Sequence, residues 1–331
     1  FKRAWNDVHF INSRERHDIN VMAALIYFYK QNKSDFNLLD AYFSSNKIKN
    51  WGFQNMVKAY IGEIYVQKFI ADNAYLDDTF LLGVALFYDT HNLIRDDGVR
   101  EDNESLNTLL EELLDCNSLK ELSLLQGNAN PGRILIDMVS KPHLLNYMAY
   151  AVQPDLMVIL QLRALLLENI QQNVKLKGIV TPREIAEEEL FDRILTIPIW
   201  KPSPRVMERF PDRLFLTKLG LSEPKFTDGE WHEILFAFSK LKQTGKMVVL
   251  VTNSALANNP TVKIRQFLVE NGNIESIIEL PDRLLENVGI ELYAVVLSHG
   301  NKGIKFLDAS QAYTEQRRRK DIDVTTVLDE S

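Results

Sequence analysis

The stretch that decides the fold of this chain is GKMVVLVTNSAL, residues 245–256. Its centre, Met247 to Thr252, is an unbroken and mostly β-branched apolar run, which is typical of a strand covered on both faces. The apolar spacing predicts a helix at 262–270 and further strands at 274–280 and 291–298. No clear helix separates these last two strands, so we expect an antiparallel edge to the sheet.

Upstream of this stretch, strands and helices alternate from about residue 121. The apolar runs and turn residues predict strands at 122–125, 147–152 and 191–197 and helices at 155–172 and 231–242. Strands that alternate with helices imply a mainly parallel sheet with helices on both faces. The expected fold class is therefore α/β.

The first third of the chain differs, because its apolar residues recur at helical spacing. These helical runs lie at 15–30, 53–73, 79–94 and 106–114. We therefore expect a helical N-terminal domain at 1–120, an α/β domain at 121–310 and a charged C-terminal tail at 311–331. The tail holds Arg317-Arg318-Arg319-Lys320, which is typical of a solvated segment, with a phosphate-binding patch as the alternative.

Composition and charge narrow the classes of protein that fit. The 331 residues are 46% hydrophobic and 25% charged, an ordinary balance for a globular protein. The longest apolar stretch, 156–167, is too short to span a bilayer, and no signal peptide is visible after Phe1. The net charge of -7 argues against tight DNA binding by this chain alone, since phosphate neutralisation supplies most of such affinity.

Cysteine and histidine usage excludes two further kinds of site. Cys116 is the only cysteine, so the chain has no internal disulfide and no multi-cysteine zinc site. The six histidines show no metal-ligand spacing, and we expect no metal. A single thiol fits a reducing compartment, so we expect a cytoplasmic protein without a membrane span.

The order of residues after 245 carries a family resemblance. Segment 121–310 resembles the catalytic domain of modification subunits of type I restriction-modification systems and related N6-adenine DNA methyltransferases. The resemblance implies a Rossmann-like class I S-adenosylmethionine methyltransferase fold, preceded by N-terminal helices. The matching positions are mostly apolar and occur in the family's order: Arg265, Leu268, Ile277-Ile278, Leu280-Pro281, Ile290, Val295-Val296-Leu297 and Phe306-Leu307-Asp308-Ala309.

The catalytic motif of that family falls on FDRILTIPIW, residues 191–200. The family motif is Asn-Pro-Pro-Phe or Asn-Pro-Pro-Tyr, and here Ile197, Pro198 and Trp200 occupy its positions. In the family, the asparagine accepts a hydrogen bond from the adenine amino group, and the aromatic residue stacks on the flipped base. Ile197 cannot accept such a bond. Trp200 could stack on a base or pack in the core.

The cofactor turn departs from the family pattern as well. The family has Asp-Pro-x-Cys-Gly-x-Gly-Gly-Phe-Leu, because glycine lets the backbone approach the cofactor closely. Here residues 126–135 keep only Gly132 and Leu135, while Asn130 is a residue that tolerates positive φ. At the position of Ala151 the family has a carboxylate, which accepts hydrogen bonds from the ribose hydroxyls, as in dinucleotide-binding folds. The nearby Asp155 is better explained as a helix N-cap.

Three departures at separate positions favour a methyltransferase-fold protein that binds no cofactor and acts as a binding or scaffold component. Its expected partner is a protein, namely a methyltransferase, specificity or nuclease subunit, with DNA and a second copy of the chain as further candidates. The alternative is an active DNA adenine N6-methyltransferase with divergent motifs, which would use Asn130 and Gly132 to bind S-adenosylmethionine.

Overall fold

The structure is a computed structural model, and it describes residues 18–45, 51–87, 104–128, 144–150, 154–170, 175–200, 208, 210, 216, 221, 229–282, 284, 290–317 and 324–328. Among these residues, no helix combines the length and apolar character needed to cross a membrane.

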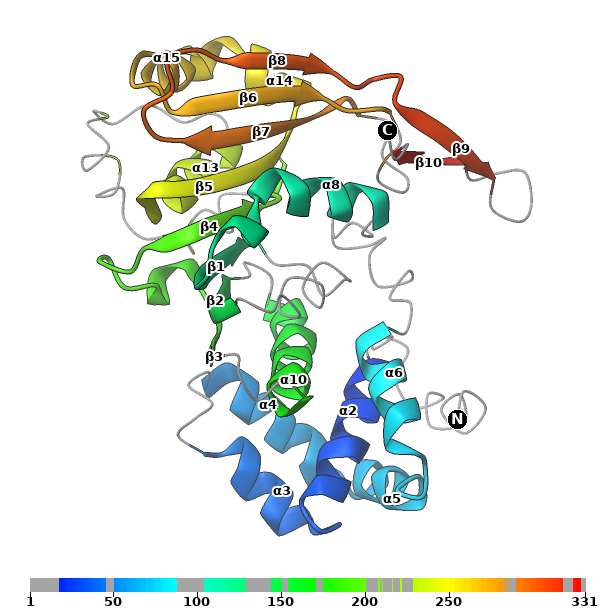
Figure 1. Ribbon diagram of the computed structural model, residues 1–331. Helices are drawn as coiled ribbons and strands as arrows, with labels where there is room; N and C mark the ends of the chain where they lie inside the picture. Colours follow the sequence, from blue (N-terminus) through cyan, green and yellow to red (C-terminus); the bar gives the residue numbers. More distant parts are fainter. Residues whose placement is uncertain are drawn as a thin grey trace.

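An eight-stranded sheet forms the body of the molecule (Figure 1). All neighbouring strands run parallel except β7, which is antiparallel to both β5 and β6. The predicted mainly parallel sheet is confirmed, but the antiparallel strand is not at the edge: β7 pairs with β5 on one side and with β6 on the other, and β8 lies beyond β6. The order is β3 (Lys175–Val180), β2 (Leu144–Tyr150), β1 (Leu122–Gly127), β4 (Phe191–Thr196), β5 (Leu241–Thr252), β7 (Leu292–Ser298), β6 (Ile274–Glu279) and β8 (Lys305–Asp308).

Strand burial follows the position of each strand in this order. In the central strand β5, the last six residues are all buried, because both faces of the sheet are covered there. Near the edge, β6 alternates between buried and half-buried residues, as expected for a strand covered mainly on one face. The apolar run from Met247 to Thr252 therefore lies at the centre of the sheet.

Helices cover the sheet on two faces. Helix α8 (Glu104–Leu114) contacts β4, β5 and β7, and its buried leucines join one core cluster. Helices α13 (Gly229–Phe238) and α15 (Val262–Glu270) contribute to a second core cluster. Alternate residues of β5 enter the two clusters, since Val248 belongs to the first and Val249 to the second. Successive side chains of a strand point to opposite faces, so the two clusters mark the two sides of the sheet.

A group of N-terminal helices lies at the end of the molecule next to α10 (Pro154–Ile170), the crossover between β2 and β3 (Figure 1). Helix α10 contacts three of them, and its buried Arg163 donates through Nε to the carbonyl of Ala85 at 3.0 Å. The first core cluster thus continues from the sheet into this group. The members are α2 (Asp18–Gln31), α3 (Phe36–Phe43), α4 (Trp51–Gly62), α5 (Ile64–Asp72) and α6 (Asp78–Phe87).

Two helix predictions need correction. The run at 53–73 is two helices, because Glu63 has an extended backbone (φ -80°, ψ 124°) and follows Gly62, a poor helix former. The helix predicted at 231–242 ends at Phe238, since Leu241 already pairs with Phe191 in the sheet. Part of the predicted run at 79–94 lies outside the described residues.

Beyond residue 310, where the sequence predicts a charged tail, the structure has an antiparallel pair of strands, β9 (Tyr313–Arg317) and β10 (Val324–Leu328). Strand β10 contacts helix α8. The boundaries drawn at 120 and 310 remain a prediction.

Candidate functional site

The candidate site lies where parallel strands β1 and β4 end side by side. Gly127, the last residue of β1, pairs with Thr196, the last residue of β4. The segment Ile197–Trp200 leaves β4 at this edge, next to Asn128. Ligands of open α/β sheets bind at the carboxyl ends of the strands, so the motif positions stand at the expected edge.

The predicted cofactor positions Asn130, Gly132 and Ala151 fall in parts of the chain that the structure does not describe. Their role stays a prediction. Of the predicted site residues, the structure places Ile197, Pro198 and Trp200 together in one short segment.

Ile197 is engaged on both its side chain and its backbone. The half-buried side chain packs against the first core cluster. Its carbonyl oxygen accepts a hydrogen bond from Nδ2 of Asn128 at 2.9 Å. Asn128 has a positive φ of 47°, a conformation that asparagine tolerates better than most residues. The backbone at the motif position is therefore hydrogen-bonded to Asn128, which links the end of β4 to the end of β1.

The two other motif residues also face protein. Pro198 is buried, and the half-buried Trp200 packs against the first core cluster. Of the two roles that the sequence leaves open for Trp200, this contact is the one expected of core packing.

The strand ends that would face a cofactor carry no carboxylate among the described residues. Gln126 stands where the family has its acidic residue, but it is only 3% exposed and accepts from the Tyr147 hydroxyl through Oε1 at 2.5 Å. Tyr150 ends β2 and is fully buried. A cofactor ribose needs hydrogen-bond acceptors at this edge. The position of the family's ribose carboxylate, Ala151, lies outside the described residues, and at the described part of this edge Gln126 and Tyr150 are bonded within the protein.

Gly127 lets a side chain cross β1 at this edge. A Cβ atom at Gly127 would lie 2.5 Å from the hydroxyl oxygen of Tyr150 and 2.5 Å from Oγ1 of Thr196. Real Cβ atoms essentially never approach other atoms so closely. The missing side chain therefore makes room for the Tyr150 phenol to reach from β2 toward β4.

Tyr150 reaches a buried carboxyl group, Glu233 on helix α13. Oε1 of Glu233 accepts from the Tyr150 hydroxyl at 3.2 Å and from Oγ1 of Thr196 at 3.3 Å. Its Oε2 accepts from the backbone N–H of Ile199 at 3.2 Å. One carboxyl group thus joins the ends of β2 and β4 to the backbone of the motif segment, and Glu233 is only 2% exposed.

Burial dominates the electrostatics of this group. Desolvation raises the pKa of Glu233 to about 7, against the lowering effect of its hydrogen bonds from Ile199, Tyr150 and Thr196. The negative charge of Glu230, one turn earlier on α13, raises that pKa further. Burial also raises the pKa of Tyr150 well above its ordinary value, with Glu233 as the next cause. The arrangement can therefore take up or release a proton near neutral pH.

Sequence reasoning missed Glu233, although a signal was present. Helix α13 reads GEWHEILFAF, and its polar residues Glu230, His232 and Glu233 are all buried. Two carboxylates spaced i, i+3 within an otherwise apolar helix indicate buried polar partners, because an unpaired buried charge is costly.

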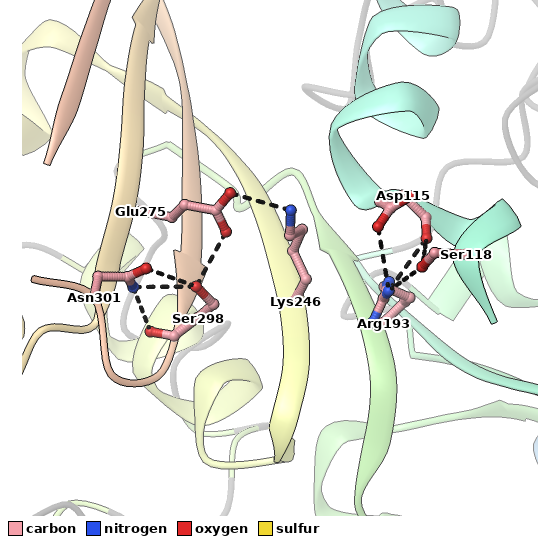
Figure 2. Close-up of polar contacts among 7 residues, drawn as sticks. All are labelled: Asp115, Ser118, Arg193, Lys246, Glu275, Ser298 and Asn301. Carbon is pink, nitrogen blue, oxygen red and sulfur yellow. Dashed lines mark hydrogen bonds and ion pairs between the residues drawn. The ribbon is translucent and has the colours of Figure 1, made fainter.

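Figure 2 shows a separate polar network away from the motif segment. The side chain of Arg193 on β4 is 6% exposed, and its Nη2 donates to the carbonyl of Asp115 at 3.2 Å and to Oγ of Ser118 at 3.0 Å. In a second group of contacts, Nζ of Lys246 on β5 lies 3.1 Å from Oε1 of Glu275 on β6, with β7 between the two strands. These contacts tie the end of α8 to β4 and join β5 to β6, so their role is structural.

A hollow with a cavity volume of about 430 Å³ lies against β5, β6 and β7, on the face that α15 covers. None of its lining residues belongs to β1, β4 or the motif segment. Among the described residues, no three histidine, cysteine or carboxylate side chains gather closely enough to hold a metal ion. Most of the lining is apolar, and it includes Trp231, Val251, Leu256, Leu268, Ile277 and Phe306.

Comparison with known proteins gives a family match and a set of similar folds. Residues 158–327 match the family model N-6 DNA Methylase. No protein of curated function matches the sequence.

The similar folds come from solved structures of methyltransferases. A type I restriction-modification methyltransferase subunit from Streptococcus thermophilus is 18% identical, with a TM-score of 0.64 over 99% of this chain and 75% of that chain. A putative class I S-adenosylmethionine-dependent methyltransferase from Listeria monocytogenes is 13% identical, with a TM-score of 0.53 over 89% of this chain and 94% of that chain. A modification subunit of a putative type I restriction enzyme from Vibrio vulnificus is 14% identical, with a TM-score of 0.53 over 77% of this chain and 57% of that chain. Likeness at such identity shows the fold.

Proposed function

Because the chain belongs to the N-6 DNA methylase family, we propose that it is a methyltransferase-fold protein that has lost cofactor binding and methyl transfer. In this proposal it acts as a binding or scaffold component in the cytoplasm, and the methyltransferase fold supplies a rigid frame.

The observation that carries the proposal is the state of Ile197. The family reaction needs a side-chain acceptor at this position for the adenine amino group, and isoleucine has none. Losing one transition-state hydrogen bond costs about 3 to 4 kcal/mol, or about 100- to 1,000-fold in rate. Here the side chain packs on the core and the carbonyl is bonded to Asn128. The side chain and the carbonyl group of Ile197 thus both make contacts within the protein.

The cofactor side supports the same proposal. Gln126, at the family's acidic position, is turned inward onto Tyr147, and Ala151, at the ribose position, has no carboxylate. We infer that Asn130, Gly132 and Ala151 no longer form a cofactor turn. Were they to do so, the described residues would contribute none of the carboxylates that hold the cofactor ribose.

The net charge of the chain favours a protein over DNA as its binding partner. Two solved structures with similar folds are described as a complex of a type I restriction-modification system and as a DNA-bound restriction-modification enzyme. We propose that this chain likewise joins a methyltransferase, specificity or nuclease subunit, with DNA or a second copy as further partners. The net charge of -7 favours a basic protein surface over bare DNA.

The experiment that tests the proposal is titration of the purified chain with S-adenosylmethionine in a calorimeter. We expect no saturable heat up to about 1 mM cofactor, which would detect binding as weak as about -4 kcal/mol. A methyltransferase of measured cofactor affinity, run in the same buffer, is the positive control. Saturable binding would overturn the proposal.

A second measurement addresses catalysis directly. The chain and its Ile197→Asn variant are incubated with labelled cofactor and DNA, and methyl incorporation is counted. Restoring the asparagine is expected to restore no transfer, because the cofactor side is also changed. Transfer by the unsubstituted chain would make the active DNA adenine methyltransferase the correct assignment. Transfer by Ile197→Asn alone would show that the cofactor site works and would overturn the proposed loss of cofactor binding.

A further inference from the structure

The buried carboxyl group of Glu233 contacts the backbone of the motif segment. Ile199 lies between Pro198 and Trp200, and its N–H donates to Oε2 of Glu233 at 3.2 Å. At the other end of the segment, Asn128 holds the carbonyl of Ile197 at 2.9 Å. Two backbone groups of the segment are therefore held by side chains: the carbonyl of Ile197 by Asn128, which follows β1, and the N–H of Ile199 by Glu233 on α13.

We propose that Glu233 is a positioning residue that holds segment Ile197–Trp200 at the end of β4, and that gain or loss of its proton changes how firmly the segment is held. The proposal concerns the chain's own motif segment, and it holds whether or not a cofactor binds.

The geometry explains why a proton matters. An ionised carboxylate offers two acceptor oxygens, and these match the three donors from Ile199, Tyr150 and Thr196. A protonated carboxyl group has one O–H that must itself donate, so at least one of the three hydrogen bonds changes direction or is lost. Hydrogen bonds to an ionised acceptor are also about twice as strong as those between neutral groups. The Ile199 bond is therefore firmer in the ionised form.

The titratable groups around Glu233 set the pH at which this change occurs. Tyr150 approaches from β2, and its phenol stays protonated because burial raises its pKa well above the ordinary value. On α13 itself, Glu230 and His232 are the titratable neighbours. Burial and the charge of Glu230 raise the pKa of Glu233 to about 7. The midpoint of the change is thus expected near neutral pH.

The test uses Trp200, the last residue of the segment, as a reporter. The full chain is labelled with fluorotryptophan, and the resonances of its four tryptophans are assigned by single Trp→Phe substitutions. Fluorine NMR spectra are then recorded from about pH 6 to about pH 8.5, the range in which groups with near-neutral pKa values titrate. We expect the Trp200 resonance to shift with one midpoint near neutral pH.

Three variants separate positioning from simple folding effects. Glu233→Gln keeps an acceptor for Ile199 but cannot titrate, so the Trp200 shift with pH should disappear. Glu230→Gln removes a nearby negative charge and should lower the midpoint. Tyr150→Phe removes a donor that stabilises the ionised form and should raise it. A flat Trp200 resonance in the unsubstituted chain, or the same titration in Glu233→Gln, would overturn the proposal. Should Glu233→Gln fail to fold, midpoints that stay unchanged in the other two variants would overturn it equally.

Discussion

The side-chain amide of Asn128 donates to the backbone carbonyl of Ile197 at 2.9 Å, across the ends of two neighbouring strands. In the family to which this chain belongs, these two strand ends bind cofactor and base. Here they bind each other. This contact is the kind of internal bonding that is expected at the edge if the proposed loss of activity is correct.

Asn128 affects stability in two ways that can be measured separately: through its side-chain hydrogen bond and through its tolerance of a positive φ. Asn128→Gly removes the hydrogen bond but keeps a residue suited to the positive φ of 47°. We expect a loss of about 1 kcal/mol in the free energy of unfolding. Asn128→Ala should cost about 1 to 2 kcal/mol more, because alanine is strained in the left-handed region. Urea unfolding followed by circular dichroism measures both values. Equal values for the two variants would contradict the assigned backbone conformation.

Gly127 is predicted to tolerate no side chain. Gly127→Ala places a methyl group 2.5 Å from the Tyr150 hydroxyl oxygen and 2.8 Å from Cβ of Thr196, so one of these side chains must move. Overpacking of this kind costs about 1 to 3 kcal/mol. The matched control is Gly83→Ala in helix α6, where an added Cβ meets nothing within 4 Å. That change should stabilise the chain by about 0.5 to 1 kcal/mol. A neutral Gly127→Ala variant in urea unfolding would show that Tyr150 does not cross β1.

Periodicity and β-branched runs predict most of this sheet. The run at Met247–Thr252 identifies the central strand, and the helix at 262–270 is confirmed at both ends. Strand β3 (Lys175–Val180) was not predicted, because Lys175, Lys177 and Gly178 break the apolar pattern. Its pairing with β2 supplies the stability that its own sequence does not signal.

The site was predictable only in part, for a different reason. Motif spacing locates Ile197 and Trp200 at a strand end, since that position depends on local sequence. Glu233 lies 34 residues from its partner Ile199 and 83 residues from Tyr150. A local sequence pattern does not show which strand ends a helix will cover. The contacts of Glu233 with Ile199, Tyr150 and Thr196 can therefore be seen only in the tertiary structure.

The networks in Figure 2 predict unequal costs for two cationic side chains. Arg193→Met should destabilise the chain by about 1.5 to 3 kcal/mol, since it removes the hydrogen bonds that this buried charged group donates to Asp115 and Ser118. Lys246→Met removes only a partly exposed ion pair with Glu275, which is worth about 0 to 1 kcal/mol. Both are measured as shifts of the urea midpoint. A larger loss for Lys246→Met would refute this ranking.

The raised pKa of Glu233 also predicts the pH dependence of global stability. Its ordinary pKa of 4.5 applies to the unfolded chain, and burial raises the folded value to about 7. Between these values the folded state binds the extra proton, so the free energy of unfolding falls as pH rises through this window and levels off above it. The full contribution is on the order of 3 kcal/mol, reduced by any relaxation around the ionised group.

Glu233→Gln isolates this contribution. The variant cannot titrate at position 233, so its stability should decline less than that of the unsubstituted chain between about pH 5 and about pH 8, with the largest gain over the parent at the alkaline end. Urea unfolding at several pH values measures the difference profile. Parallel profiles would mean that Glu233 ionises normally in the folded state. Ionisation of Glu233 strengthens its hydrogen bond to Ile199, but placing the charge in the protein interior is unfavourable. As pH rises, we therefore expect the motif segment to be held more firmly while the free energy of unfolding of the whole chain falls.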